Sequence, residues 1–315
     1  MYWLGIDLGG TNIATGVVDE NYNIIGRGKL KTNAGRSAEE LADDIIKAAQ
    51  IAIKNANIDA SQITSMGIGV PGSIDPEKGI VIRAENLYYE NLPLCQMLKD
   101  RTGYDFYIEN DANAAAYGEL IAGVGKGKKH LIAITLGTGV GGGIIIDGKI
   151  YSGATHAGGE LGHTIMIHGG VPCSCGNAGC FEAYASATAL IRQTKDAMIK
   201  NKDSIMWNIA TTLENVNGLT AFDAMRKGDK AGTDVVNQYI EYLCVGIYNM
   251  INIFQPEIIC IGGGISKEGD VLLNPIKKYV TDNCFAHGVG TEIKIAKLGN
   301  DAGIIGAAFL CNLYK

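Results

Sequence analysis

Short apolar runs near the start of the chain predict three strands that follow one another as a meander. The runs cover residues 2–8, 12–18 and 24–30, and polar or glycine-rich stretches separate them. Runs of this length, bounded by turn residues and repeated at short intervals, are typical of strands that pair with their neighbours along the chain.

A helix and further alternating elements follow the meander. Ser37 and Glu40 have the spacing of a capping box, and apolar residues recur at every fourth position after them, which predicts a helix. Apolar residues 63–70 predict a strand that ends at Pro-Gly. Residues 104–109 predict another strand, and the alanine-rich residues 111–121 predict a helix.

The opening pattern returns later in the chain. Residues 4–11, LGIDLGGT, align with residues 132–139, IAITLGTG, at an offset of 128, and the strands after each turn match as well. One repeat of this length predicts two similarly built domains. Chance similarity between two glycine-rich hairpins is the alternative.

The second half of the chain continues with helical patterns. We expect helices at 182–200 and 231–254, a buried strand at 258–261, and a last helix that Asp301 caps and that ends near Leu313. The fold class that follows is α/β.

Composition narrows the class of protein. Glycine is frequent, with 43 in 315 residues, and 14 of them lie between residues 137 and 179 without a collagen period. Such glycines serve tight turns or the close approach of backbone to a ligand. The net charge of −6 offers no basic surface for nucleic acid. A signal peptide and an apolar run of membrane-spanning length are both missing, so we expect a cytoplasmic protein without a nucleic-acid or membrane partner.

Two familiar glycine motifs do not fit their structural context. Gly137-x-Gly139-x-x-Gly142 matches a dinucleotide-binding fingerprint, but that fingerprint requires a helix after the turn, and here a strand is predicted. A P-loop-like run ends at Gly148-Lys149 and is followed by isoleucine, which has no hydroxyl group for Mg²⁺. Asp147-Gly148 is better interpreted as a hairpin turn.

The two glycine hairpins indicate a phosphate-binding function. Successive backbone N–H groups and the hydroxyl groups of Thr11 and Thr138 would donate to phosphate oxygens, and glycine allows close approach. Asp7, at the end of the first strand, would hold Mg²⁺ directly or through water. Two ordinary meander turns are the alternative.

These motifs resemble those of the ROK family (repressor, open reading frame, kinase), in the sugar-kinase branch of the actin-like, ribonuclease-H-like ATPases. The resemblance covers the whole chain and rests on DLGGT at 7–11, GVPG at 69–72, ENDAN at 109–113, LGTGVG at 136–141, GGELGH at 158–163, CSCGNAGCFE at 173–182 and GGG at 262–264. Family repressors carry a DNA-binding segment ahead of the first motif, and Asp7 lies so early that we expect a kinase.

The resemblance implies a two-domain fold with an interdomain cleft. The smaller domain would comprise residues 1–115 and 300–315, and the larger one residues 116–299, with hinge closure over the sugar. It also implies a homodimer, and ATP with Mg²⁺ as the phosphoryl donor. The implied nucleotide-binding residues are Asp7, Gly9, Gly10, Thr11, Asn12, Gly137, Thr138, Gly139, Gly262, Gly263 and Gly264.

A candidate metal site follows the second hairpin. His163, Cys173, Cys175 and Cys180 form a Cys₃His set, which is the composition of a closed structural zinc site. The other five of the eight cysteines are scattered, as is usual for a reducing compartment. Three unlinked thiols and a core histidine are the alternative. The resemblance assigns these four residues to Zn²⁺, and implies that His163 presents its other nitrogen to the sugar.

The resemblance also implies the sugar site. Its residues are Gly72, Asn86, Asn110, Asp111, Glu160, His163 and Glu182. Carboxylates, an amide and an imidazole are the partners that sugar hydroxyl groups require. As alternatives, Glu160 is a solvated loop residue, Glu182 starts a helix, and Asn86 follows the family pattern only loosely.

Asp111 is the predicted general base, with an ordinary helix N-cap as the alternative. The expected reaction is ATP-dependent phosphorylation of the 6-hydroxyl group of a hexose, most simply glucose. Another hexose or an N-acetylhexosamine (fructose, allose, mannose, N-acetylglucosamine or N-acetylmannosamine) is the alternative substrate, and a non-catalytic sugar sensor is the alternative class. A zinc hydrolase would need an open coordination position, which a full Cys₃His set lacks.

Overall fold

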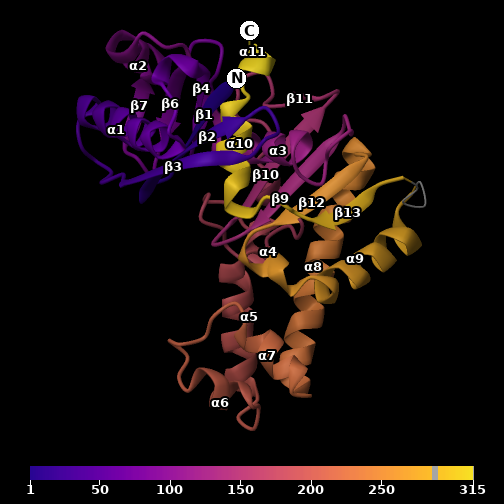
Figure 1. Cartoon of the computed structure of the whole chain (residues 1–315). Coiled ribbons are helices and arrows are strands. Elements are labelled where there is room, and N and C mark those ends of the chain that lie inside the picture. The colour runs from indigo at the N-terminus through magenta and orange to yellow at the C-terminus, as the bar shows by residue number, and fades with distance from the viewer. Residues whose placement is uncertain (286–289, 315) are drawn as a thin grey trace. The chain divides into compact units, whose positions relative to one another are not determined.

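The fold is described from a computed structural model that covers residues 1–285 and 290–314 (Figure 1). The chain divides into two compact units, which we call unit 1 and unit 2. Unit 1 comprises residues 1–133, 143–159 and 297–315, and unit 2 comprises residues 134–142 and 160–296. The predicted domain boundaries near residues 115 and 300 stay a prediction.

A five-stranded sheet with the order β3-β2-β1-β4-β8 forms the centre of unit 1. Its strands are β1 (Tyr2–Leu8), β2 (Asn12–Asp19), β3 (Ile24–Lys31), β4 (Ile63–Val70) and β8 (Phe106–Asn110). The first three strands form the predicted antiparallel meander, while β4 and β8 add in parallel. Parallel strands bring their carboxyl ends to one edge, so Asp7 lies opposite Gly69, and Asn110 opposite Val70.

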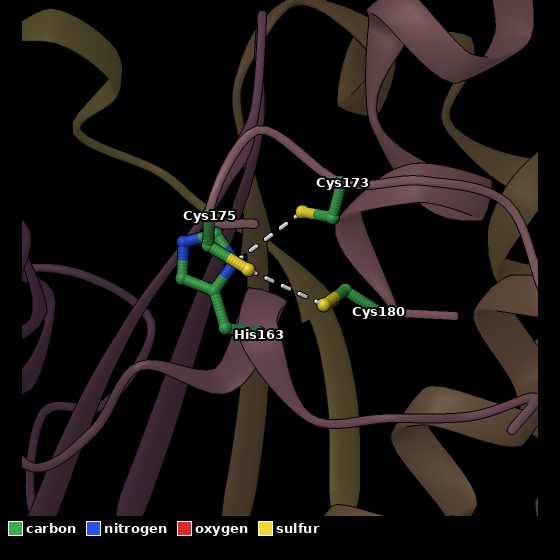
Figure 2. A group of neighbouring side chains, drawn as sticks. All are labelled: His163, Cys173, Cys175 and Cys180. Carbon is green, nitrogen blue, oxygen red and sulfur yellow. Dashed lines mark hydrogen bonds between the residues drawn. The ribbon is translucent and has the colours of Figure 1, made fainter. Parts of the chain in front are cut away.

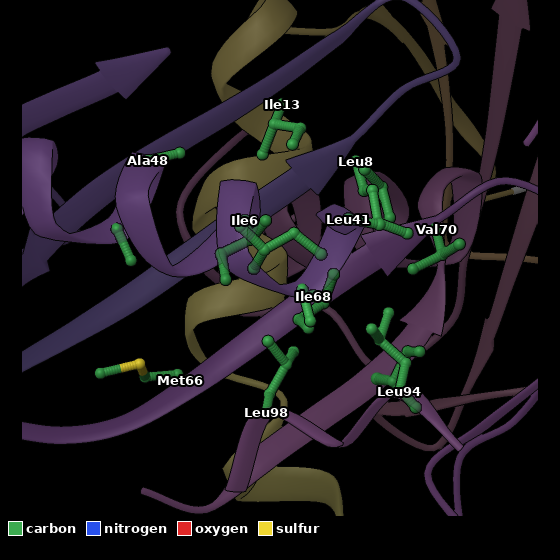
Figure 3. Close-up of a cluster of buried hydrophobic side chains, with 14 of the residues drawn as sticks. Ile6, Leu8, Ile13, Leu41, Ala48, Met66, Ile68, Val70, Leu94 and Leu98 are labelled. Atoms are coloured by element: carbon green, nitrogen blue, oxygen red, sulfur yellow. The ribbon is translucent and has the colours of Figure 1, made fainter. Parts of the chain in front are cut away.

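Helices α1 (Ala38–Ala56) and α2 (Leu94–Thr102) contribute to a buried apolar core with this sheet. The capping box predicted for α1 is confirmed, because Ser37 and Glu40 bond reciprocally. Figure 3 shows side chains of this core, including Ile6, Leu8, Ile13, Met66, Ile68 and Val70 from the strands and Leu41, Ala48, Leu94 and Leu98 from the helices.

Helix α10 (Ala302–Ala308) packs against β1, β4 and α3 (Asp111–Ile121). It approaches the sheet so closely that a Cβ atom at Gly5 would lie 1.8 Å from the carbonyl oxygen of Ile304. At Gly67 a Cβ atom would lie 1.9 Å from the carbonyl oxygen of Ala307. Much of the glycine excess outside residues 137–179 therefore serves helix–sheet packing in unit 1.

The last helix begins directly after Asp301, as predicted, but it is not the single helix expected to end near Leu313. The segment forms the 3₁₀ turn η4 (Gly299–Asp301), then α10, then α11 (Cys311–Tyr314). Asp301 provides no side-chain cap, because its carboxylate accepts from both terminal nitrogens of Arg27 at 2.7 and 2.8 Å. Between the helices, the ring of Phe309 lies 4.6 Å from that of Trp3.

Unit 1 also contains elements that the sequence patterns did not predict. They are a small sheet of β5 (Ser73–Asp75), β6 (Ile80–Ala84) and β7 (Tyr89–Leu92), and the 3₁₀ turn η1 (Ala60–Gln62).

A second five-stranded sheet has the order β11-β10-β9-β12-β13. Its strands are β9 (Leu131–Leu136), β10 (Val140–Ile146), β11 (Lys149–Ile150), β12 (Ile258–Gly262) and β13 (Glu292–Ile295). The order repeats that of the first sheet element by element, which confirms the internal repeat. Gly142 lies inside β10, so the turn does not lead into a helix, as dinucleotide binding would require.

The helices of unit 2 are α4 (Glu182–Ala185), α5 (Ala187–Lys200), α6 (Met206–Ala210), α7 (Thr220–Arg226), α8 (Lys230–Phe254) and α9 (Asp270–Asn283), with 3₁₀ turns η2 (Leu161–His163) and η3 (Gly264–Glu268). The helix predicted at 231–254 is confirmed as α8. The helix predicted at 182–200 is broken at Ser186, whose hydroxyl group accepts from the Ala189 N–H at 3.0 Å and so begins α5 anew. Among the described residues, every helix is too short or too polar to span a bilayer.

Candidate active site

Two carboxylates meet at the carboxyl edge of the first sheet. Asp7 ends β1 opposite Gly69, and a Cβ atom at Gly69 would lie 3.4 Å from the Cα atom of Asp111. Burial, and then the charge of Asp111, raise the pKa of Asp7 to about 6. Burial also raises the pKa of Asp111, against a hydrogen bond from the Ala112 N–H. Paired carboxylates of this kind attract a cation or a proton.

Asn110, and not Asp111, caps helix α3. The Asn110 side-chain oxygen accepts from the N–H groups of Ala112 and Asn113 at 2.9 and 3.1 Å. Its amide nitrogen donates to the carbonyl oxygen of Gly72 at 3.1 Å. Asp111 is the first residue of the helix, and its Oδ1 also accepts from the Ala112 N–H, at 2.8 Å, while Asn110 provides the cap.

The first glycine turn lines a cavity of about 780 Å³ within unit 1. The predicted nucleotide residues Asp7, Gly9, Gly10, Thr11 and Asn12 are among its lining residues, together with Lys29 and Asp301. The Gly9 N–H donates to the Asn12 carbonyl oxygen at 2.9 Å and closes the turn. The Asn12 side-chain oxygen is buried and lacks a hydrogen-bond partner. A buried polar atom without a partner is a position where a ligand can supply the missing bond.

Of the predicted sugar residues of unit 1, Asn86 lies beside this turn, and Gly72 lies beside Asn110. A Cβ atom at Gly10 would lie 3.4 Å from the backbone oxygen of Asn86, whose side chain is exposed. Gly72 has a φ angle of +110°, and a Cβ atom there would lie 2.2 Å from the Arg83 carbonyl oxygen, so only glycine fits. Asn110 and Gly72 are joined directly, as described above.

The second glycine turn, in unit 2, is held by Glu182 and by the start of α5. Glu182 Oε2 accepts from the Val140 N–H at 2.9 Å. The Ala187 N–H donates to the Gly137 carbonyl oxygen at 2.8 Å, and the Thr188 hydroxyl group donates to the Thr138 carbonyl oxygen at 2.7 Å. The break at Ser186 therefore directs the first residues of α5 onto the turn.

The triple glycine 262–264 lies beside the same turn. A Cβ atom at Gly263, whose φ angle is +88°, would lie 2.3 Å from the carbonyl oxygen of Leu136, the residue before Gly137. Gly264 has open space around its Cα atom. Within unit 2 the structure thus brings together Gly137, Thr138, Gly139 and residues 262–264.

The four predicted metal ligands form one cluster (Figure 2). Their ligand atoms all lie within 4.8 Å of one another. Cys175 and Cys180 sulfur atoms are 3.6 Å apart, and His163 Nδ1 is 3.7 Å from the sulfur of Cys173. A tetrahedral zinc ion with bonds of about 2.0–2.3 Å needs ligand separations of roughly 3.5–3.8 Å. The donor set and its spacing therefore fit Zn²⁺.

Glu160 and His163 come from the η2 segment. The His163 N–H donates to the Glu160 carbonyl oxygen at 3.0 Å, and the Glu160 side chain is exposed. Because His163 faces Cys173 through Nδ1, its Nε2 atom remains for another partner. Glu182 Oε1 accepts from Ser174 in the cysteine loop at 3.2 Å, so this carboxylate joins the cluster to the second glycine turn.

Residues 3–313 match the ROK family. The chain belongs to the ROK family. A glucokinase of Thermotoga maritima is 38% identical over 97% of this chain and 95% of its own length. A glucokinase of Halalkalibacterium halodurans is 36% identical over 98% of this chain and 94% of its own. A crystal structure of a ROK family glucokinase from Streptomyces griseus, in complex with glucose and AMPPNP, is 34% identical with a TM-score of 0.80, and the match covers 98% of this chain and 99% of that one.

This ROK chain accordingly has the two-domain, actin-like, ribonuclease-H-like fold of sugar kinases. Glu109 belongs to the motif at 109–113 but had no predicted role, and it is buried directly before Asn110. Its signal in the sequence was an acidic residue at the end of an otherwise apolar strand.

Proposed function

We propose that this protein is an ATP-dependent glucokinase that transfers the γ-phosphoryl group to the 6-hydroxyl group of glucose. The observation that carries the proposal is the similarity, along almost the full length of each chain, to glucokinases at 36–38% identity. The complex of the Streptomyces griseus relative with glucose and AMPPNP supports the same pair of substrates.

Asp111 is the general base of the proposed reaction. Its carboxylate accepts the proton of the 6-hydroxyl group while that oxygen attacks the γ-phosphorus and the bond to the β-phosphate oxygen breaks, releasing ADP. The raised pKa of Asp111 supports this role, because a base is most effective when its pKa approaches the working pH. Positioned proton transfer of this type contributes about 10²–10⁴-fold to the rate.

Asp7 and Asn12 are the residues that would hold a divalent cation, which we propose to be Mg²⁺. The unpartnered oxygen of Asn12 and the carboxylate of Asp7, with its raised pKa, support this assignment, since oxygen donors suit this cation. When bound, Mg²⁺ neutralises charge on the phosphate oxygens. The glycine turns at 9–11 and 137–139, with 262–264, bind the nucleotide through backbone N–H groups and the two threonine hydroxyl groups.

The Cys₃His cluster is a structural Zn²⁺ site in this proposal. The Asn177 N–H donates to the Cys175 sulfur and lowers the pKa of that thiol, whereas burial and then the neighbouring Cys175 raise the pKa of Cys180, so Cys175 loses its proton first. A metal on Nδ1 fixes the direction of His163, which then presents Nε2 to a sugar hydroxyl group. Glu160, Glu182, Asn110, Asn86 and Gly72 complete the proposed sugar contacts.

The proposal is tested by coupled measurement of ADP release. The purified chain is given glucose, fructose, allose, mannose, N-acetylglucosamine or N-acetylmannosamine, each with and without Mg²⁺. We expect the highest kcat/KM with glucose, and activity only with the metal. A higher kcat/KM with another of these sugars would make that sugar the proposed substrate. Absence of sugar-dependent ADP release would overturn the proposed kinase activity. Light scattering on the same preparation tests the homodimer that we also propose.

A further inference from the structure

Glu109 is a buried carboxylate that the proposed reaction does not use. Only 2% of its surface is exposed, although it lies immediately before Asn110 and Asp111. Side chains alternate between the two faces of a strand. Ile108 points into the core that includes α1 and α2, so Glu109 points to the opposite face, toward α3 and α11.

Three donors satisfy the Glu109 carboxylate. Oε1 accepts from the backbone N–H of Asn110 at 2.7 Å and from Nδ2 of Asn113 at 3.1 Å. Oε2 accepts from the hydroxyl group of Tyr314. A buried carboxylate without donors would be strongly unfavourable. The network therefore explains how Glu109 is tolerated, and it joins the end of the chain to the segment that carries Asn110.

Tyr314 is the donor in its contact with Glu109. Burial and then the nearby Glu109 charge raise the pKa of Tyr314, which keeps the phenol protonated near neutral pH. One side of Tyr314 lines a cavity of about 520 Å³ with Cys95 and Tyr107. Loss of the hydroxyl group alone would leave the packing of the ring in place.

The network restrains Asn110 on its backbone side, while other contacts restrain its side chain. Glu109 holds the Asn110 N–H, and the Asn110 side chain is fixed to the first turn of α3 and to Gly72. Asp111 follows directly in the chain, so these bonds restrain the backbone from which its carboxylate extends. A displacement of about 1 Å at a reacting group can lower a rate about 10²-fold.

We infer that Glu109 and Tyr314 are positioning residues that hold Asn110 and Asp111 in place for phosphoryl transfer. The inference rests on the proposed function. It means that the turnover rate depends on Tyr314 in α11, a segment that has no other part in the proposed reaction. Neither residue contacts a substrate in this assignment, and both act through Asn110.

The test compares Tyr314→Phe with Tyr104→Phe in the full-length chain. The Tyr104 hydroxyl group donates to the Ala60 carbonyl oxygen at 2.8 Å, also in unit 1, so this control removes a tyrosine hydrogen bond unrelated to Asp111. We expect Tyr314→Phe to lower kcat with glucose about tenfold and to leave the KM for MgATP within about twofold. The control should keep kcat within about twofold, even where thermal unfolding shows a similar loss of stability.

A second pair of variants changes Glu109 itself. In Glu109→Gln, the amide oxygen can accept from Asn110 and Asn113 while the amide nitrogen donates to Tyr314, so kcat should stay within about threefold. Glu109→Leu removes all three bonds and should lower kcat at least about 10²-fold. Circular dichroism establishes that each variant is folded before it is assayed.

The outcomes separate the inference from the proposed function. Folded Tyr314→Phe with a kcat equal to that of Tyr104→Phe would overturn the inference, and so would equal losses in Glu109→Gln and Glu109→Leu. A wild-type chain without sugar-dependent ADP release would overturn the proposed function and the inference with it. An active wild type with fully active Tyr314→Phe would overturn the inference alone.

Discussion

Replacement of Asp7 by asparagine should stabilise the protein while it removes activity. The folded chain raises the pKa of Asp7 from 3.8 to about 6, through burial and then the charge of Asp111. A folded-state pKa above the unfolded value means that the native carboxylate is unfavourable once it is ionised. Asparagine has nearly the same shape but carries no charge, so it avoids this unfavourable term.

The size and pH range of the effect follow from those two values. A tenfold change in a proton-binding constant corresponds to about 1.4 kcal/mol, so the penalty is at most about 3 kcal/mol, and about 2 kcal/mol if solvent reaches part of the carboxylate. The wild type loses this stability as the pH rises from about 4 to about 6, and the loss is complete above that range. Asp7→Asn should therefore match the wild type near pH 4 and exceed it by about 2–3 kcal/mol at pH 7.5.

Urea unfolding at pH 4.5, 6 and 7.5, without and with millimolar Mg²⁺, measures the effect. Asp19→Asn is the matched control, because the pKa of Asp19 is shifted in the opposite direction. Burial raises that pKa, but hydrogen bonds from the side chain and backbone of Asn23 and from the backbone of Asn21 outweigh burial and lower it. That variant should lose stability at pH 7.5. Mg²⁺ should stabilise the wild type and leave Asp7→Asn unchanged. An Asp7→Asn chain that is less stable than the wild type at pH 7.5 would refute the reasoning.

Three further predictions concern the proposed chemistry. Asp111→Asn should lower kcat by about 10²–10⁴-fold. Its affinities for glucose and ATP, measured by calorimetry, should be largely kept. Near-normal turnover would contradict the role of Asp111 as the general base. Gly139→Ala should weaken ATP binding at least about tenfold, because its Cβ atom would lie 2.2 Å from Glu182 Oε2. The carboxylate must then move and lose the bond from the Val140 N–H that holds the turn. Gly137→Ala meets no atom within 4 Å and should keep the melting temperature, a result that Gly139→Ala should not share. Cys175→Ala should lose bound zinc, which elemental analysis measures. It should also lose sugar-dependent turnover while its affinity for ATP is kept. Full activity of a zinc-free chain would contradict the role of zinc in the sugar site.

Local sequence patterns predicted much of the fold. The meander of unit 1, the capping box at Ser37, the strand at 63–70 and helices α3 and α8 follow from spacing and capping residues alone. The repeat at an offset of 128 predicted the second sheet, because the same strand–glycine–strand pattern meets the same packing requirements. The family was likewise evident from motifs of fixed spacing.

Residues that are far apart in the sequence decided the rest. The start of the last helix was predicted, but its break and the missing Asp301 cap were not. Arg27 binds Asp301, and Phe309, between α10 and α11, packs on Trp3; no local pattern reveals either contact. The break at Ser186 depends on bonds from the start of α5 to the turn at Gly137. The three-stranded sheet of β5, β6 and β7 is an exception, because it lies within residues 73–92 and pairs neighbours in the chain; its strands of three to five residues are too short to show a clear alternating pattern.

The sequence by itself determined which residue types are available for chemistry, since a ROK motif fixes identity and spacing. The tertiary structure decided the pKa values and the hydrogen-bond partners of these residues. The raised pKa of Asp7 arises from burial and from Asp111, more than one hundred residues away in the chain. The Glu109 carboxylate, which accepts from the Asn110 N–H, also accepts from the hydroxyl group of Tyr314, at the opposite end of the chain. Burial and charge proximity depend on folded distances, and a linear pattern does not contain them.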